Sequence, residues 1–254
     1  MRYAVLADIH ANRHALDAVL QAVRTDGVDG YLVAGDLVGY GAFPNECVER
    51  IAALEAACVA GNHDLIVLGQ LTDERCIPLA KTSLAWTRNV LTDDARSYLE
   101  GLPRSIDTGP VVIAHGSLED PQEYTRTPAQ AVDQLARLER EHPQARILVV
   151  GHTHRPWACD TAGREPDRGR ALTLAEERLL LNPGAVGQSR ELRVRARYLL
   201  LDLDQGSAEF KAVRYDTRAC RAALVARGLS PRSTHLRPTL RGALRRGRRA
   251  LSGG

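Results

Sequence analysis

The chain has 254 residues, of which 44% are hydrophobic and 26% are charged, and its formal net charge is +3. This composition is that of an ordinary globular protein, long enough for one large domain or two small ones. The first residues, MRYAVLADIH, lead directly into a strand pattern with no evident signal peptide or membrane span, and the five cysteines are odd in number and lack CxxC spacing. We therefore expect no disulfide framework, no thiolate zinc site, no membrane partner and a cytoplasmic location.

Short apolar runs alternate with helix-like stretches along the first part of the chain. The pattern predicts strands at 3–7, 30–35, 57–61, 110–116 and 147–151. It predicts helices at 12–24, 45–56 and 128–141, and a longer helical region that includes 79–100. Such βα alternation indicates an α/β architecture whose strands are buried on both faces.

The pattern changes after residue 151. Segment 160–171 is rich in glycine, proline and charge, which predicts an exposed excursion or hairpin. Three apolar runs then follow without helices between them, so we expect adjacent, antiparallel strands at 178–184, 196–204 and 207–215. This change indicates two sheets or one mixed sheet.

Polar residues suited to binding metals follow each of the first five strands. They are Asp8 and His10 after the first, Asp36 after the second, Asn62, His63 and Asp64 after the third, His115 after the fourth, and His152 and His154 after the fifth. Five of the eight histidines lie at these positions, which a random distribution would rarely produce. Ligands of open α/β sheets bind beyond the carboxyl ends of the strands, so these side chains are expected to meet in one site.

Carboxylate, amide and imidazole ligands without thiolate suit divalent ions such as Mn²⁺, Fe²⁺, Zn²⁺ or Ni²⁺. The candidate ligands outnumber the four that one tetrahedral ion can bind, which indicates two metal ions. A carboxylate can bridge two ions at about 3.5 to 4 Å, the separation at which two-metal hydrolases hold the attacking and leaving oxygens. The charge of two divalent ions exceeds that of the ligand carboxylates, and the net positive charge suits a phosphate ester. In extended chain, His152 and His154 project to the same side, which would let them reach neighbouring ions.

Five short motifs occur in a fixed order: DIH, GDLVGYG, GNHD, a lone HG and GHTH. Together they resemble the calcineurin-like metallophosphoesterase superfamily, and within it the small bacterial and archaeal phosphodiesterase branch, whose members often carry a loop similar to NPGAVG at 182–187. We predict a four-layer αββα sandwich of two mixed β-sheets flanked by helices, with a dinuclear metal site at the strand ends. This domain is expected to span 1–215, and 216–254 to form a helical, arginine-rich extension partly docked on it.

The resemblance implies seven metal ligands: Asp8, His10 and His154 for one ion, Asn62, His115 and His152 for the other, and Asp36 as the bridge between them. It also implies that His63 is not a ligand but protonates the leaving alkoxide or donates to a phosphate oxygen. Asp64 would either orient His63 or cap a helix.

Three further residues are candidates for substrate binding. Asn12 stands at a predicted helix start, where anions are favoured, although a cap role would also explain it. Tyr40 follows the bridging Asp36 and stands where the Ser/Thr protein phosphatases and dinucleoside tetraphosphatases of the superfamily carry an arginine. Without that guanidinium the bidentate clamp on a phosphoryl group is missing, which favours phosphodiester substrates. Arg190, in GQSR, either replaces this arginine from the other side of the cleft or lies on the surface.

The end of the chain differs in charge from the rest. Residues 211–254 contain 12 Lys and Arg residues and a single acid, Asp216, whereas the first 210 residues contain 22 basic and 30 acidic residues. This tail is a candidate for binding nucleic acid through its phosphates. Arginine runs without aromatic residues also occur on solvated helix faces, so both interpretations stay open.

The motifs together predict a phosphodiesterase in which a hydroxide bridging two metal ions attacks phosphorus and His63 protonates the leaving oxygen. Mn²⁺ is the ion we expect to support activity in vitro. Three alternatives stay open. A phosphomonoesterase would use the same metals, a nuclease or other nucleic-acid end-processing enzyme would recruit the tail, and a scaffold or nucleotide sensor would bind metal without turnover. The sequence makes no prediction of the oligomeric state.

Overall fold

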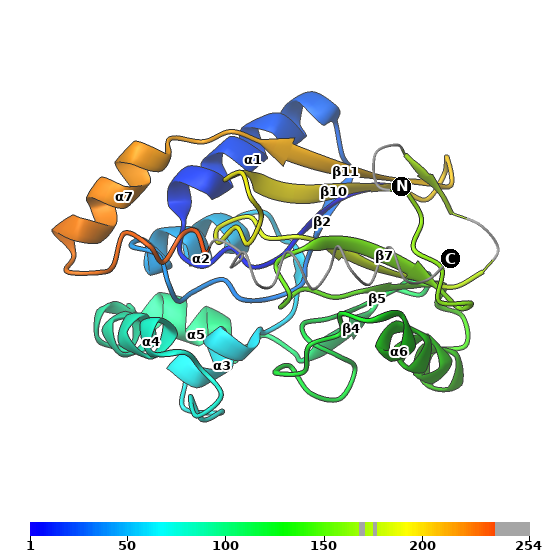
Figure 1. Cartoon of the computed structure of the whole chain (residues 1–254), viewed down its shortest axis with the longest axis horizontal. Helices are drawn as coiled ribbons and strands as arrows, with labels where there is room; N and C mark the ends of the chain where they lie inside the picture. Colours follow the sequence, from blue (N-terminus) through cyan, green and yellow to red (C-terminus); the bar gives the residue numbers. More distant parts are fainter. Residues whose placement is uncertain (168–170, 175–176, 237–254) are drawn as a thin grey trace.

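The computed structural model describes residues 1–167, 171–174 and 177–236 (Figure 1). Two β-sheets lie face to face between two layers of helices, so the chain forms the predicted four-layer αββα sandwich. Within the described residues, each helix is too short or too polar to cross a membrane.

The first sheet contains six strands in the order β3-β2-β1-β10-β11-β8. Their bounds are Arg2–Leu6 (β1), Gly30–Val33 (β2), Ala57–Cys58 (β3), Leu172–Thr173 (β8), Ala196–Asp202 (β10) and Ser207–Val213 (β11). The neighbours β1, β2 and β3 pair in parallel, whereas β10 pairs antiparallel with both β1 and β11. The carboxyl ends of β1, β2 and β3 therefore lie at one edge.

The second sheet contains five strands in the order β4-β5-β6-β9-β7. Their bounds are Ser105–Asp107 (β4), Val111–Ala114 (β5), Ile147–Val149 (β6), Pro156–Asp160 (β7) and Leu179–Pro183 (β9). The strands β5, β6 and β9 are parallel, and β4 and β7 close the two sides as antiparallel strands. The sheet is therefore mixed, like the first.

Helices cover the outer face of each sheet. The first sheet is covered by α1 (Arg13–Asp26), α2 (Pro44–Ala52), α3 (Asn62–Val67), α4 (Pro78–Val90) and α5 (Asp93–Glu100), and the second by α6 (Pro128–Glu141). Three of them, α2, α4 and α6, begin with proline, which has no N–H to leave unpaired at a helix start. The helix α6 has the predicted bounds, and Thr127 caps it by accepting the Gln130 amide at 3.3 Å.

The core follows from the alternation of side chains along the strands. In β1 and the residue that follows it, Ala4 and Leu6 pack under the helices, whereas Val5 and Ala7 face the second sheet. Both faces of the central strands are therefore buried, which explains why these strands are continuous apolar runs.

Two predictions about these elements were wrong. The helical region 79–100 is broken at Leu91 and Thr92, because Leu91 is extended and the Thr92 hydroxyl caps α5 by accepting the Ala95 amide. The strand at 178–184 is not beside the strands at 196–204 and 207–215. It is β9, which lies between β6 and β7 in the other sheet, where its apolar face can be buried on both sides.

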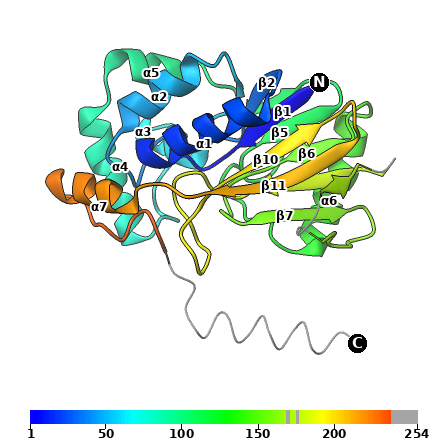
Figure 2. The same ribbon diagram turned by 90° about the horizontal axis from the view of Figure 1, so that it is seen from above.

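The described part of the C-terminal extension begins with α7 (Thr217–Ala226), which packs against α1 at the end of the molecule away from α6 (Figure 2). Leu224 and Leu229 are buried against Phe43, with Trp86 packed beside them. Residues 230–236 then lead back toward the loop after β9. The arginine-rich tail beyond Leu236 lies outside the described residues.

The NPGAVG segment carries the chain from β9 in one sheet toward β10 in the other. On the way, the Val186 amide donates to Ala7 O at 3.0 Å and the Gly187 amide donates to Asp8 O at 2.9 Å. A Cβ at position 187 would overlap the carbonyl of Ile9. Glycine is therefore required here by the close approach of two backbones.

We expect Gly187→Ala to lower the free energy of unfolding by about 3 kcal/mol, because the added methyl group would push the loop away from β1. Gly101→Ala is the matched control, since its Cβ would meet nothing nearer than Tyr98 O at 3.5 Å, and its effect should stay within about 1 kcal/mol. Urea unfolding of both variants measures the difference, and equal losses would contradict this account of the loop.

Candidate metal centre

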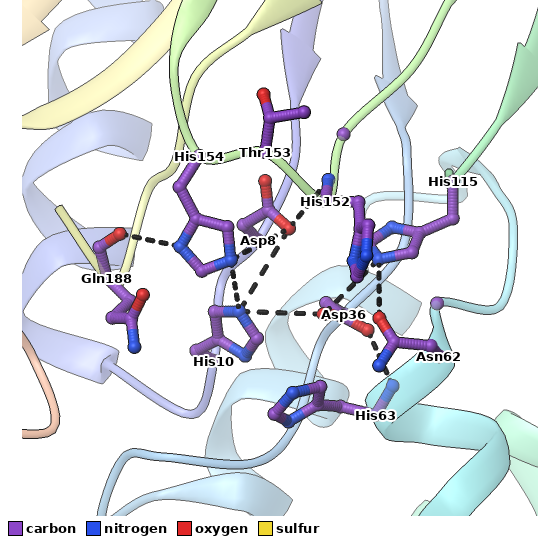
Figure 3. A network of polar contacts seen from close by, with 12 residues as sticks. Asp8, His10, Asp36, Asn62, His63, His115, His152, Thr153, His154 and Gln188 are labelled. Carbon is purple, nitrogen blue, oxygen red and sulfur yellow. Dashed lines mark hydrogen bonds and ion pairs between the residues drawn. The ribbon is translucent and has the colours of Figure 1, made fainter. Parts of the chain in front are cut away.

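Seven polar side chains meet where the strands of both sheets end (Figure 3). They are Asp8, His10, Asp36, Asn62, His115, His152 and His154, and none is more than 6% exposed. The loops after β1 and β2 come from the first sheet, the loops after β5 and β6 come from the second, and Asn62 begins α3. The structure therefore brings together all the side chains proposed as metal ligands.

The ligand atoms form two groups that share one carboxylate. In each group the candidate atoms lie within 4.8 Å of one another: Asp8, His10, Asp36 and His154 in the first, and Asp36, His115 and His152 in the second. Asn62 adds to the second group, because its Oδ1 lies 3.1 Å from His115 Nε2. Asp36 stands between the groups, which is the place of a bridging ligand.

Three histidines are oriented by backbone carbonyls. Each donates from Nδ1: His10 to Val38 at 3.1 Å, His115 to Ala34 at 2.6 Å, and His154 to Gln188 at 2.8 Å. A carbonyl oxygen can only accept, so these bonds favour a proton on Nδ1, and in the neutral ring Nε2 then carries the lone pair that can bind a metal. This is how proteins commonly orient histidines that bind metals.

Several buried atoms of the cluster have no hydrogen-bond partner in the described part of the chain: Asp8 Oδ2, Asp36 Oδ2 and His152 Nε2. An unpaired buried polar atom costs roughly 1–3 kcal/mol, so proteins seldom leave three in one place. Divalent cations would satisfy all three, and the carboxylate, amide and imidazole donors match Mn²⁺, Fe²⁺, Zn²⁺ and Ni²⁺. The residues therefore fit divalent metal ions.

Burial and neighbouring charges shift the pKa values of these groups in opposite directions. Burial raises the pKa of Asp8 to about 7. Burial would also raise the pKa of Asp36, but His115 and His63 hold it well below its usual range. For His115, burial alone would lower the pKa, but Asp36, whose Oδ2 lies 3.3 Å from Nε2, raises it to about 9. Metal binding would therefore compete with protonation of His115.

The loops reach this geometry through left-handed backbone conformations. Five of the ligands have positive φ: Asp8 (54°), His10 (48°), Asp36 (56°), His152 (62°) and His154 (58°). Non-glycine residues seldom adopt this region, which costs about 1–3 kcal/mol for each residue, and such residues cluster at functional sites.

These conformations show that one prediction for the GHTH loop was wrong. We predicted that His152 and His154 lie in extended chain and project to the same side. Instead both are left-handed and they turn to different groups. The His154 ring lies 4.8 Å from the His10 ring, and the His152 ring lies 5.2 Å from the His115 ring.

The residue His63 lines a cavity of about 310 Å³ that opens over the cluster. Its ring centroid lies 4.8 Å from those of both Tyr40 and His10. A Cβ on Gly39 would overlap His63 Nδ1, so glycine at this position leaves room for the ring. Burial lowers the pKa of His63.

Asp64 takes the second of the two roles considered for it. Its carboxylate accepts backbone amides from Gly61 at 2.9 Å, Val38 at 3.1 Å and Leu37 at 3.2 Å. These bonds cap α3 and join the GNHD loop to the GDLVGYG loop. The Asp64 side chain therefore supports the backbone of the site and is not oriented toward His63.

The three candidates for substrate binding have different positions. Tyr40 and Arg190 line the cavity, and Arg190 Nη2 lies 3.3 Å from His154 Nε2, so Arg190 is not a remote surface residue. Asn12 does not line the cavity. Its side chain caps α1 by accepting the Ala15 amide at 3.2 Å and donates to Gly187 O at 2.7 Å. The geometry therefore favours the cap role for Asn12 over substrate binding.

Sequence reasoning missed several residues around the cavity. Tyr124 stacks near His152 with ring centroids 4.1 Å apart, and Arg75 and Arg155 line the same cavity. No motif marks these three positions. Gln188 and Asn182, in contrast, belong to NPGAVGQSR, a segment that is part of the resemblance to the superfamily. The Asn182 side-chain amide donates to Gly151 O at 2.6 Å and so holds the start of the GHTH loop.

A buried cluster of aspartate and histidine residues at the edge of two mixed sheets defines a metallophosphoesterase-type protein. Residues 1–206 match the calcineurin-like phosphoesterase superfamily domain, so the chain belongs to this superfamily.

Three known proteins are similar to this chain over most of their length. Protein MJ0912 of Methanocaldococcus jannaschii is 31% identical over 220 residues, which is 85% of this chain and 88% of that protein. The crystal structure of a metallophosphoesterase from Sphaerobacter thermophilus is 33% identical, with a TM-score of 0.78, and the match covers 92% of this chain and 97% of that one. The crystal structure of protein PH1004 from Pyrococcus horikoshii is 21% identical, with a TM-score of 0.73 over 92% of this chain and 96% of that one, and supports the fold alone.

Metal addition should stabilise the protein, because ions bind the folded cluster and not the unfolded chain. At Mn²⁺ concentrations 100 times the dissociation constant, we expect a gain of about 2.7 kcal/mol and a higher midpoint of thermal unfolding. At a fixed Mn²⁺ concentration the gain should increase as the pH rises toward 9, because protons compete with the ion for His115, whose pKa Asp36 raises to about 9.

Asp36→Asn should reduce this shift sharply, because it removes the carboxylate that both groups share. The matched control is His142→Ala, since His142 is bonded to Asp107 and takes no part in the cluster. A full Mn²⁺ shift in Asp36→Asn would show that the ions bind elsewhere.

Proposed function

We propose that this protein is a metal-dependent phosphodiesterase with two divalent ions held by the seven clustered ligands and with His63 as its general acid. The observation that carries the proposal is the pair of ligand groups that share Asp36 beneath a cavity lined by His63. Two ions bound there would neutralise phosphate charge and acidify water for attack on phosphorus. Mn²⁺ is the ion we expect to be effective in vitro.

His63 is placed to deliver a proton to a leaving oxygen. It lines the cavity beside the shared Asp36, and its backbone amide donates to Asp36 Oδ1 at 2.8 Å, which fixes its position relative to the ligands. Burial lowers the pKa of His63, but an anionic phosphoester in the cavity favours the protonated ring by charge attraction. Substrate binding would therefore favour the protonated form of His63, which is the form that can act as a general acid.

The walls of the cavity support an ester with groups on both sides of the phosphorus. Tyr40 and Tyr124 supply aromatic surface, and Arg190 supplies a guanidinium next to His154. Arg190 lines the same cavity as Tyr40, the position where related phosphatases carry their arginine, and can bind a phosphoryl oxygen there. The aromatic surface of the cavity wall suits the organic groups of a diester, and this is the feature that favours a diester here.

Hydrolysis of bis-p-nitrophenyl phosphate and p-nitrophenyl phosphate tests the proposal directly. Metal-stripped protein should be inactive, Mn²⁺ should restore faster cleavage of the diester, and Asp36→Asn should abolish it. A faster monoester reaction would make the protein a phosphomonoesterase. Metal binding without turnover of either ester would favour the scaffold alternative.

The role of His63 requires a comparison of leaving groups. We expect His63→Ala to lower kcat about 10²–10⁴-fold for a diester with an alkoxide leaving group, which must be protonated as it leaves. The loss should be much smaller for bis-p-nitrophenyl phosphate, because p-nitrophenolate leaves without a proton. His142→Ala is the control, and equal losses on the two substrates would show that His63 binds phosphate and does not act as an acid.

Nucleic acid is a second candidate substrate, favoured by the position of the last described residue. Leu236 lines the cavity, and the arginine-rich sequence 237–254 follows it directly. A chain ending at Leu236 should lose affinity for a single-stranded oligonucleotide and show a weaker salt dependence of binding, while its rate on bis-p-nitrophenyl phosphate stays unchanged. Unchanged oligonucleotide affinity, measured by fluorescence anisotropy, would exclude this role of the tail.

A further inference from the structure

The last described residues run along the loop that carries Arg190. Ser189 and His235 form a parallel β-bridge, in which the Ser189 amide donates to Thr234 O at 3.2 Å and the Leu236 amide donates to Ser189 O at 3.1 Å. Ser233 and Thr234 are buried, and Leu236 lines the cavity over the metal cluster. A segment far from every metal motif in sequence therefore forms part of the cavity wall.

His235 adds a side-chain bond to this pairing. Its Nε2 donates to the backbone oxygen of Glu191 at 2.8 Å, and this oxygen can only accept. The Glu191 carboxylate is in turn held by two hydrogen bonds from Arg197, at 2.7 and 2.8 Å. The loop is thus fixed from the first sheet through Arg197 and from the C-terminal segment through His235.

The residues on either side of Ser189 both act on the first ligand group. Gln188 O accepts the Nδ1 proton of His154 at 2.8 Å, and Arg190 Nη2 lies 3.3 Å from His154 Nε2. Arg190 Nε also donates to Gln188 Oε1 at 3.2 Å. Ser189, the residue between them, is the one that the C-terminal segment holds through two backbone hydrogen bonds.

We propose that residues 233–236 belong to the substrate-binding site, where they position Arg190 over the metal cluster, and that His235 is the positioning residue. This inference rests on the proposed function, because it assigns Arg190 to the phosphoryl group of the substrate. His235 lines neither the cavity nor the cluster of proposed metal ligands. It acts through the backbone of Glu191, which fixes the direction in which the neighbouring Arg190 side chain leaves the loop.

The experiment compares two truncations and three point variants. One chain ends at Leu236 and keeps the segment, and another ends at Arg232 and lacks it. His235→Ala removes the bond to Glu191, His235→Gln keeps a side-chain N–H donor, and Arg190→Ala removes the guanidinium. His142→Ala is the matched control, since its ring is bonded to Asp107 at 2.7 Å, outside the cluster. Thermal unfolding checks that each variant folds.

Two measurements are made on each variant with Mn²⁺ present: kcat and KM for bis-p-nitrophenyl phosphate, and the affinity for inorganic phosphate by calorimetry. We expect Arg190→Ala, His235→Ala and the chain ending at Arg232 each to raise KM and weaken phosphate binding about tenfold, with little change in kcat. The chain ending at Leu236 should bind as the full chain does, and His235→Gln should restore most of the affinity.

The double variant separates positioning from a general loss of stability. In the Arg190→Ala background, His235→Ala should cost less than twofold further, because its effect passes through Arg190. Additive losses, a fall in kcat alone, or unchanged phosphate affinity in Arg190→Ala or His235→Ala would overturn the inference. If the full chain hydrolyses neither ester, the proposed function fails, and the phosphate titration still decides whether His235 positions Arg190.

Discussion

The buried carboxylate of Asp36 is the group on which the rest of the site depends. One oxygen accepts the His63 amide at 2.8 Å, and the other lies 3.5 Å from His10 Nε2 and 3.3 Å from His115 Nε2. His10 follows a strand of the first sheet and His115 a strand of the second, so Asp36 lies where the edges of the two sheets meet. A Cβ on Gly61 would overlap Asp36, which explains why the GNHD loop begins with glycine.

Strain in the ligand loops is offset by their pairing with one another. The left-handed residues after β1 donate backbone hydrogen bonds to the loop after β2: Asp8 to Gly35 at 3.1 Å, His10 to Asp36 at 2.9 Å and Ala11 to Leu37 at 2.8 Å. The Asp8 carboxylate in turn accepts the His152 amide at 3.1 Å, which ties in the loop after β6. Each loop is therefore held in an unfavourable conformation by its neighbours, which fixes the positions of the clustered side chains.

This dependence on neighbours separates what the sequence could predict from what it could not. The strands and α6 follow from local features, namely apolar runs and caps such as Thr127, and the ligands follow from their positions at strand ends. The left-handed turn of His152 and the insertion of β9 beside β6 depend on contacts with distant parts of the chain. The break at Thr92 was visible as a cap residue, but the apolar periodicity on both sides concealed it.

The same distinction explains why the metal side of the site is readable from motifs and the substrate side is not. The ligands lie on loops that leave parallel strands, and that geometry recurs whenever such a sheet forms. The substrate side is assembled from pieces without such a rule. Gly228, Leu229, Ser230 and Ser233 border a second cavity with Tyr40, and residues 234–236 hold the loop of Arg190, so one C-terminal segment reaches both candidate substrate residues. On the proposed function, changes in this segment would alter which ester is bound while Asp36 and the other proposed metal ligands stay in place. If Arg190 and Tyr40 contact the substrate as proposed, substrate choice in this chain is encoded largely outside the residues that mark it as a phosphoesterase.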